Sequence, residues 1–155
     1  MTRKNHSSFL CVAAAALLCA AAVPASAHPN LSGNWTLIPA QSTYHGQPAT
    51  QTGDIKIEQR HGQLFISRHL FIDGPNSGME FSFTTDGHEG STIHQGKNMK
   101  TKAEWHGDTL EVKTKMNDQL TVEKYRLSPE GDQMVLVVDT PDGQTSTLVF
   151  RRAGY

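Results

Sequence analysis

The chain has 155 residues, of which 14 are basic and 15 are acidic, and its formal net charge is −1. This length is sufficient for one domain with a buried core, and the interspersed charges argue against nucleic acid or an anionic lipid surface as a partner. The two cysteines, Cys11 and Cys19, both lie within the first 27 residues.

Residues 1–27 have the pattern of a secretory signal peptide. Two basic residues near the start precede an alanine-rich apolar run over 10–23 and an Ala-Ser-Ala sequence that ends at Ala27. The apolar run is shorter than the roughly 20 residues that span a bilayer, so we expect no stable membrane insertion. We expect cleavage after Ala27 and a periplasmic or secreted protein that begins at His28. Since that protein contains no cysteine, it has neither a disulfide nor thiol chemistry.

From Gly33 onward, apolar and polar residues alternate in short segments, which is typical of strands with one buried face. Leu110, Val112 and Thr114, for example, alternate with charged residues. Glycine, asparagine and aspartate between the segments favour tight turns. The pattern predicts about ten strands, over 33–38, 54–59, 63–72, 78–84, 91–95, 98–105, 108–116, 118–128, 133–139 and 145–152.

These strands are expected to close into one barrel over residues 28–155. An open meander would leave two edge strands exposed, so we predict an all-β fold, a single up-and-down antiparallel meander barrel of about 8–10 strands. If every hairpin reverses the chain, the first strand begins and the last strand ends at the same pole. Trp35 then lies beside Arg152, and the guanidinium would close that pole by stacking on the indole.

The sequence Gly33-Asn34-Trp35 at the start of the first strand, with Arg152 on the last strand, resembles the G-x-W and arginine pairing of the lipocalin and calycin barrels. A wider set of residues, including Thr85-Asp86-Gly87, is similar to the sequences of a group of small secreted bacterial lipocalin-like proteins. This resemblance implies structural roles in barrel closure for Gly33, Trp35 and Arg152. It also implies a one-ended cup that holds a small hydrophobic or amphipathic molecule.

Small inward residues give an independent argument for a cup. Thr101, Ala103 and Trp105 share one face of a predicted strand, and Thr114 is a polar residue on the apolar face of the next strand. Because two of these residues are small, they would leave space that contains a hydroxyl, and we take all four as candidate ligand-binding residues. The alternative is a tightly packed core that tolerates threonine, and the pattern favours neither.

Arg68 and Tyr44 complete the candidate ligand site. Arg68 shares the parity of Leu64 and Ile66, so it could point inward and anchor an anion. The opposite face of that strand is equally apolar, however, and we favour an exposed Arg68 beside a β-bulge. The long connection over 39–53 could be a lid over the barrel mouth, with Tyr44 and His45 as contact residues, or a simple loop.

Histidines suggest a metal site as an alternative function. His61, His88 and His106 occupy alternate turns and should share one pole, where His28 also begins the exported chain. Imidazoles suit copper or zinc. Their spacing matches no recognised metal site and turn histidines are normally solvated, so we expect no cofactor.

Enzymatic motifs are absent from the sequence: it has no G-x-S-x-G elbow, no phosphate-binding glycine loop and no H-E-x-x-H. We therefore favour a binding protein over an enzyme, with a small apolar or amphipathic molecule as its partner. A third alternative is a protease inhibitor that inserts its tail, residues 28–32, into an active site. The ligand's identity and the oligomeric state have no signature in the sequence.

Overall fold

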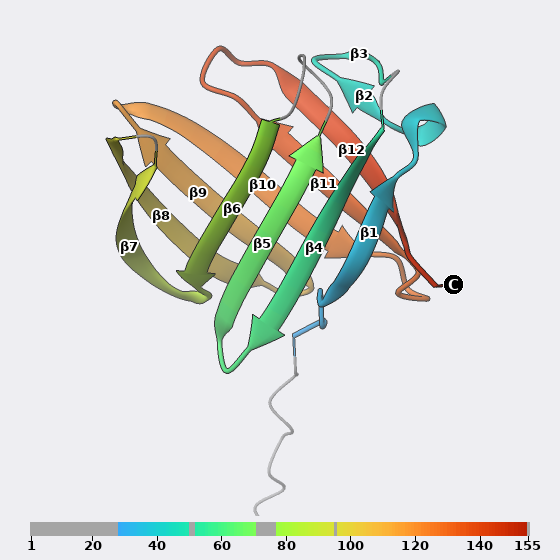
Figure 1. Ribbon diagram of the computed structural model, residues 1–155, viewed down its shortest axis with the longest axis horizontal. Helices are drawn as coiled ribbons and strands as arrows, with labels where there is room; N and C mark the ends of the chain where they lie inside the picture. The colour runs from blue at the N-terminus through green and yellow to red at the C-terminus, as the bar shows by residue number, and fades with distance from the viewer. Residues whose placement is uncertain (1–27, 50–51, 71–76, 95, 155) are drawn as a thin grey trace, which may run out of the picture.

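The computed structural model describes residues 28–49, 52–70, 77–94 and 96–154, and the predicted signal peptide lies outside them. The described chain forms a barrel of antiparallel strands with one short 3₁₀ helix, η1 (Pro39–Gln41) (Figure 1). None of its helical residues forms a segment long and apolar enough to cross a membrane. The strands are β1 (Gly33–Leu37), β2 (Thr43–Tyr44), β3 (Gln47–Pro48), β4 (Gly53–Arg60), β5 (Gln63–Leu70), β6 (Ser77–Thr84), β7 (Asp86–His94), β8 (Lys97–His106), β9 (Thr109–Met116), β10 (Gln119–Leu127), β11 (Gln133–Asp139) and β12 (Thr145–Arg152).

The predicted all-β meander barrel is confirmed. The main sheet runs in the order β6-β5-β4-β1-β12-β11-β10-β9-β8-β7, and every pair in it is antiparallel. The first long strand therefore pairs with the last, as barrel closure requires. The barrel remains open on one side, because β6 and β7 stand at the two ends of this order and are not paired with each other.

Strand β7 begins earlier than predicted, at Asp86 instead of residue 91. Its first half is rich in glycine and polar residues, which gives little apolar alternation. The register with β8 shifts between Asp86 and Glu89, and Gly87 has a φ of +79°. Such a shift bends a strand, which is consistent with β7 diverging from β6. The predicted ends of two segments, residues 71–72 and 95, lie outside the described residues.

One end of the barrel, called here the Trp35 end, is closed by the predicted arginine contact. Trp35 pairs with Arg152 across β1 and β12, and the guanidinium carbon lies 4.2 Å from the centroid of the indole ring. Arg152 also donates to the carbonyls of Ser32 (2.6 Å) and Gly131 (2.9 Å). These contacts tie the tail, the first strand and the β10–β11 turn together.

The apolar core fills the half of the barrel nearest the Trp35 end. Trp35, Tyr125, Phe150 and Met134 are fully buried there, together with Leu31, Ile55, Ile57, Leu64, Leu110 and Leu136. The tail is part of this core, because Leu31 is fully buried and its carbonyl accepts a hydrogen bond from Trp35 Nε1 at 3.0 Å. A tail that is docked in this way is poorly suited to insertion into a protease.

The opposite end, called here the Tyr44 end, carries the connection over 39–53. This connection contains η1 and the small β2–β3 hairpin, and Thr43 pairs with Thr147 of β12. The hairpin lies beside the start of β12 at the upper rim in Figure 1. His45 N donates to Ser146 Oγ at 3.0 Å, which fixes the hairpin against the rim. Over residues 39–49 the connection therefore packs on β12 and is not a simple loop.

Candidate functional site

Two cavities occupy the half of the barrel nearest the Tyr44 end. The threonine chamber, about 190 Å³, includes Thr114 and Thr121 in its wall. The tyrosine chamber, about 250 Å³, includes Tyr44. The chambers share Arg68, Met79 and Glu123, so they lie on either side of these three side chains. This end of the barrel is hollow, whereas the Trp35 end is filled.

The walls of both chambers are mostly apolar. The threonine chamber has aromatic and sulfur-containing side chains, which are Phe81, Phe83, Met99 and Met116. In the tyrosine chamber, Leu70, Val138 and Leu148 join the shared Met79 as apolar residues, and polar groups from Thr140, Ser146 and His45 lie near the rim. A mostly apolar wall with few polar groups is typical of a site for a small organic ligand.

A buried ion pair stands between the chambers. Arg68 Nη1 donates to Glu123 Oε1 at 2.6 Å, and the side chains are 14% and 10% exposed. The second carboxylate oxygen, Oε2, accepts a hydrogen bond from the Tyr125 hydroxyl at 2.7 Å. The guanidinium also lies 4.8 Å from the centroid of the Phe81 ring and 3.9 Å from Met79 Sδ.

The preference for an exposed Arg68 is wrong. The side chain points into the barrel with Leu64 and Ile66, while the opposite face of β5 is turned outward and Phe65 is 43% exposed. No register shift occurs in β5, because its pairing with β4 and β6 is continuous over the whole strand. Glu123 supplies the reason, since a buried guanidinium needs an opposite charge to offset its desolvation.

The protonation states follow from this geometry. Burial opposes the charge on Arg68, but the interactions with Glu123 and Tyr125 together outweigh it, and the pKa of Arg68 is raised above its ordinary value. Burial, together with the Glu123 charge, raises the pKa of the Tyr125 hydroxyl well above its ordinary value. At neutral pH the arginine is therefore a cation and Tyr125 a neutral donor.

Sequence reasoning did not identify Glu123 and Tyr125 as site residues. The signal that could have found Glu123 is the one that singled out Arg68, a charged residue in phase with apolar neighbours. Glu123 shares its parity with Tyr125 and Leu127, and it pairs with the inward-facing Val112 of β9. Two opposite charges on inward faces would have predicted an interior ion pair.

The threonines predicted to mark interior space form part of a row across three strands. Thr114 of β9 lies opposite both Thr101 of β8 and Thr121 of β10. Thr114 and Thr121 face the threonine chamber. Thr101 is 7% exposed, and among the described residues its Oγ1 has no hydrogen-bond partner. Thr114 and Thr121 thus place two hydroxyls in the cavity wall, whereas Thr101 lines neither chamber.

The other predicted ligand contacts lie in different places. Tyr44 lines the tyrosine chamber and stacks on His45, with 4.0 Å between the ring centroids. Ala103 is fully buried in the filled core. Trp105 packs against that core and stacks on His28 with 4.9 Å between centroids. Neither Ala103 nor Trp105 lines the two chambers.

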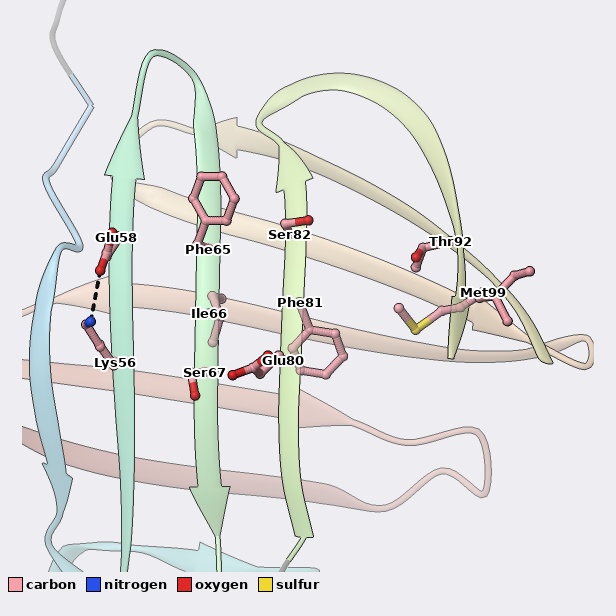
Figure 2. Close-up of a pocket in the computed structure, with 11 residues that line it drawn as sticks. Lys56, Glu58, Phe65, Ile66, Ser67, Glu80, Phe81, Ser82, Thr92 and Met99 are labelled. Atoms are coloured by element: carbon pink, nitrogen blue, oxygen red, sulfur yellow. Dashed lines mark ion pairs between the residues drawn. The ribbon is translucent and has the colours of Figure 1, made fainter. Parts of the chain in front are cut away.

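A groove of about 410 Å³ lies outside the barrel at the gap between β6 and β7. Figure 2 shows Phe65 of β5 and Phe81 of β6 on one side, with Thr92 and Met99 across the gap. Phe81 and Met99 also line the threonine chamber, so they separate the groove from the interior. The groove includes exposed charged groups such as Glu80, which distinguishes it from the mostly apolar chambers.

The histidine alternative gains no support from the described residues. They contain no group of three or more histidine, cysteine, aspartate or glutamate side chains that could hold a metal ion. His61, His88 and His106 are exposed, and His28 is engaged with Trp105. His88 lies 3.3 Å from Asp86, and His106 lies 3.1 Å from Glu104. His28, His88 and His106 thus have separate neighbours instead of a shared centre.

No protein-family model and no curated protein matches the sequence. Among solved structures, the chain is similar to wild-type fluorescent protein UnaG, with a TM-score of 0.59 and 17% identity over 79% of this chain and 97% of that one. The fold is that of a lipocalin-like, fatty-acid-binding-protein-like barrel.

Two further structures have the same architecture. Fatty-acid-binding protein 1 of Echinococcus granulosus has a TM-score of 0.59 and 8% identity over 80% of this chain and 98% of that one. Human cRBP IV has a TM-score of 0.58 and 21% identity over 81% and 99%. At these identities the similarity shows a common fold alone.

Proposed function

We propose that the protein is an exported carrier or receptor for a small apolar or amphipathic molecule, which it holds inside the barrel. The observation that carries this proposal is the pair of apolar chambers on either side of the buried Arg68–Glu123 pair. A barrel made only for stability would gain by filling this space, since cavities cost packing energy. The names of two similar structures, a fatty-acid-binding protein and a fatty acid transporter, support the same class of ligand.

The size of the chambers indicates how such a ligand would lie. Each chamber is smaller than the roughly 300–1,000 Å³ typical of a site for a drug-sized molecule. A ligand of that size would therefore occupy both and pass beside Arg68. Tyr44 and His45, on the β2–β3 hairpin, would contact it at the rim. Export of the carrier is proposed from the signal-peptide pattern of residues 1–27.

The first test is native mass spectrometry of protein purified from the periplasm or the culture medium. We expect a mass above that of the chain beginning at His28, with the excess released as an organic molecule on unfolding. A metal mass on the native protein, with no organic adduct, would favour the histidine alternative and contradict the proposal.

A binding assay with the neutral dye Nile red tests the location of the site. Thr114→Trp places an indole in the threonine chamber, so we expect dye affinity to fall by about tenfold or more. Thr36→Trp is the matched control, because Thr36 is exposed on the outer face of β1. Equal binding by both variants would place the dye outside the barrel and refute an interior site.

A further inference from the structure

The charges inside the barrel cancel, and this restricts the ligand. Among the described residues, Arg68 and Glu123 are the aspartate, glutamate, lysine or arginine side chains that line the two chambers. We infer that the interior selects an uncharged amphipathic molecule with an oxygen acceptor, such as a hydroxyl, carbonyl or ester group, over a free carboxylate. This inference rests on the proposed function and names the ligand class of that site.

Glu123 is held too firmly to give way to an anionic ligand. Its Oε1 accepts from Arg68 and its Oε2 accepts from Tyr125, so both carboxylate oxygens are engaged. A ligand carboxylate on the free side of the Arg68 guanidinium would lie within a few ångströms of this fixed negative charge. In a buried site solvent screens such repulsion weakly. The interior would then hold two anions and one cation.

An uncharged oxygen avoids this repulsion and still finds donors. A guanidinium carries five N–H donors; in the described residues Arg68 donates to Glu123, lies near Met79 Sδ and also interacts with Tyr125. Arg68 lines both chambers, so an uncharged oxygen in either chamber lies near its guanidinium. Thr114 and Thr121 add a second observation, since both line the threonine chamber and each carries a hydroxyl.

A positively charged ligand is disfavoured for the corresponding reason. Its cation would have to approach Glu123, whose two oxygens are already bonded, within reach of the Arg68 charge. The mostly apolar walls of the chambers suit an alkyl or ring body, and the ion pair provides a polar contact point between the two chambers. Dodecanol and dodecanoate separate these possibilities, because they share one chain and differ in the head group.

The experiment measures displacement of Nile red by dodecanol, methyl dodecanoate, dodecanoate and dodecylamine at pH 8. For the native protein we expect the alcohol and the ester to bind about tenfold or more tightly than the acid or the amine. Glu123→Gln removes the negative charge and keeps an acceptor for Tyr125. This variant should gain affinity for dodecanoate and lose the preference for the alcohol over the acid.

A double variant keeps the test decisive if the single variant fails to fold. Arg68→Gln with Glu123→Gln leaves a neutral pair, so it should bind the alcohol and show no gain for dodecanoate. Native protein that binds dodecanoate as tightly as dodecanol would overturn the inference and leave the proposed function standing. Native protein that binds neither the dye nor any of the four molecules would refute the proposed function itself.

Discussion

Removal of one member of the interior ion pair should destabilise the protein far more than removal of both. Arg68 and Glu123 are 14% and 10% exposed, and their nearest atoms lie 2.6 Å apart. Glu123→Ala would leave the guanidinium charge buried and Tyr125 without its acceptor. A buried ion left without its partner costs about 3–5 kcal/mol in the free energy of unfolding. A neutral pair, Arg68→Met with Glu123→Gln, should cost less than half of that.

Urea unfolding followed by tryptophan fluorescence measures these differences, since Trp35 is buried and Trp105 is partly buried. The matched control is Glu58→Ala, which breaks two exposed pairs, Lys56 Nζ with Glu58 Oε1 at 2.9 Å and Arg60 Nη2 with Glu58 Oε2 at 2.6 Å. Solvent screens both pairs, so we expect no resolvable change. If Glu123→Ala behaved like Glu58→Ala, or if the double variant cost as much as Glu123→Ala, the pair would not be a coupled buried unit.

Three further predictions follow from individual contacts. Gly33→Ala should lower the free energy of unfolding by about 1–3 kcal/mol, because Gly33 has a φ of +150° and an added Cβ would lie 2.9 Å from Arg152 Nη1. A thermal melt measures this loss, and a melting temperature equal to that of the native protein would contradict the prediction. Phe81→Ala should speed dye release in stopped flow, because Phe81 separates the outer groove from the threonine chamber, whereas Phe65→Ala, which alters the groove alone, should not. The hydrogen bond and charge of Lys113 lower the pKa of Glu111 below its ordinary value of 4.5. The ionised Glu111 therefore stabilises the folded protein fully above pH 4.5, and this contribution is lost as the pH falls through the lowered pKa. Glu111→Gln should weaken the acid dependence of the free energy of unfolding in that pH range.

The closure of the barrel could be predicted from sequence because it depends on parity and on few residues. An even number of alternating strands brings the start of β1 and the end of β12 to one end, so Trp35 meets Arg152. A glycine at position 33 leaves room for the guanidinium beside the indole. The start of β7 could not be predicted in this way. Its early residues are glycine and polar, and they form a strand because the neighbouring β8 offers a paired edge.

The interior site was only partly predictable because its residues are separated in sequence. Strand β5 is apolar on both faces, so alternation could not show that Arg68 points inward and Phe65 outward. The orientation is decided by Glu123, which lies 55 residues away in the chain. Thr114 could be identified because a lone hydroxyl interrupts an apolar face. Trp105 faces the barrel interior as Thr101 does, but it lies in the filled half. The alternation within one strand does not show where the filled half ends and the hollow half begins.

The two halves of the barrel have different physical roles. The Trp35 end buries aromatic and aliphatic side chains tightly, and this packing supplies most of the hydrophobic stabilisation. Near the Tyr44 end, a charged pair and empty space occupy positions where apolar residues would pack as well or better, since buried ion pairs are often neutral or costly for stability. The filled half can offset that cost. The Arg68–Glu123 ion pair, which has no net charge and lies beside hollow chambers, is therefore better explained by ligand selection than by stabilisation of the core.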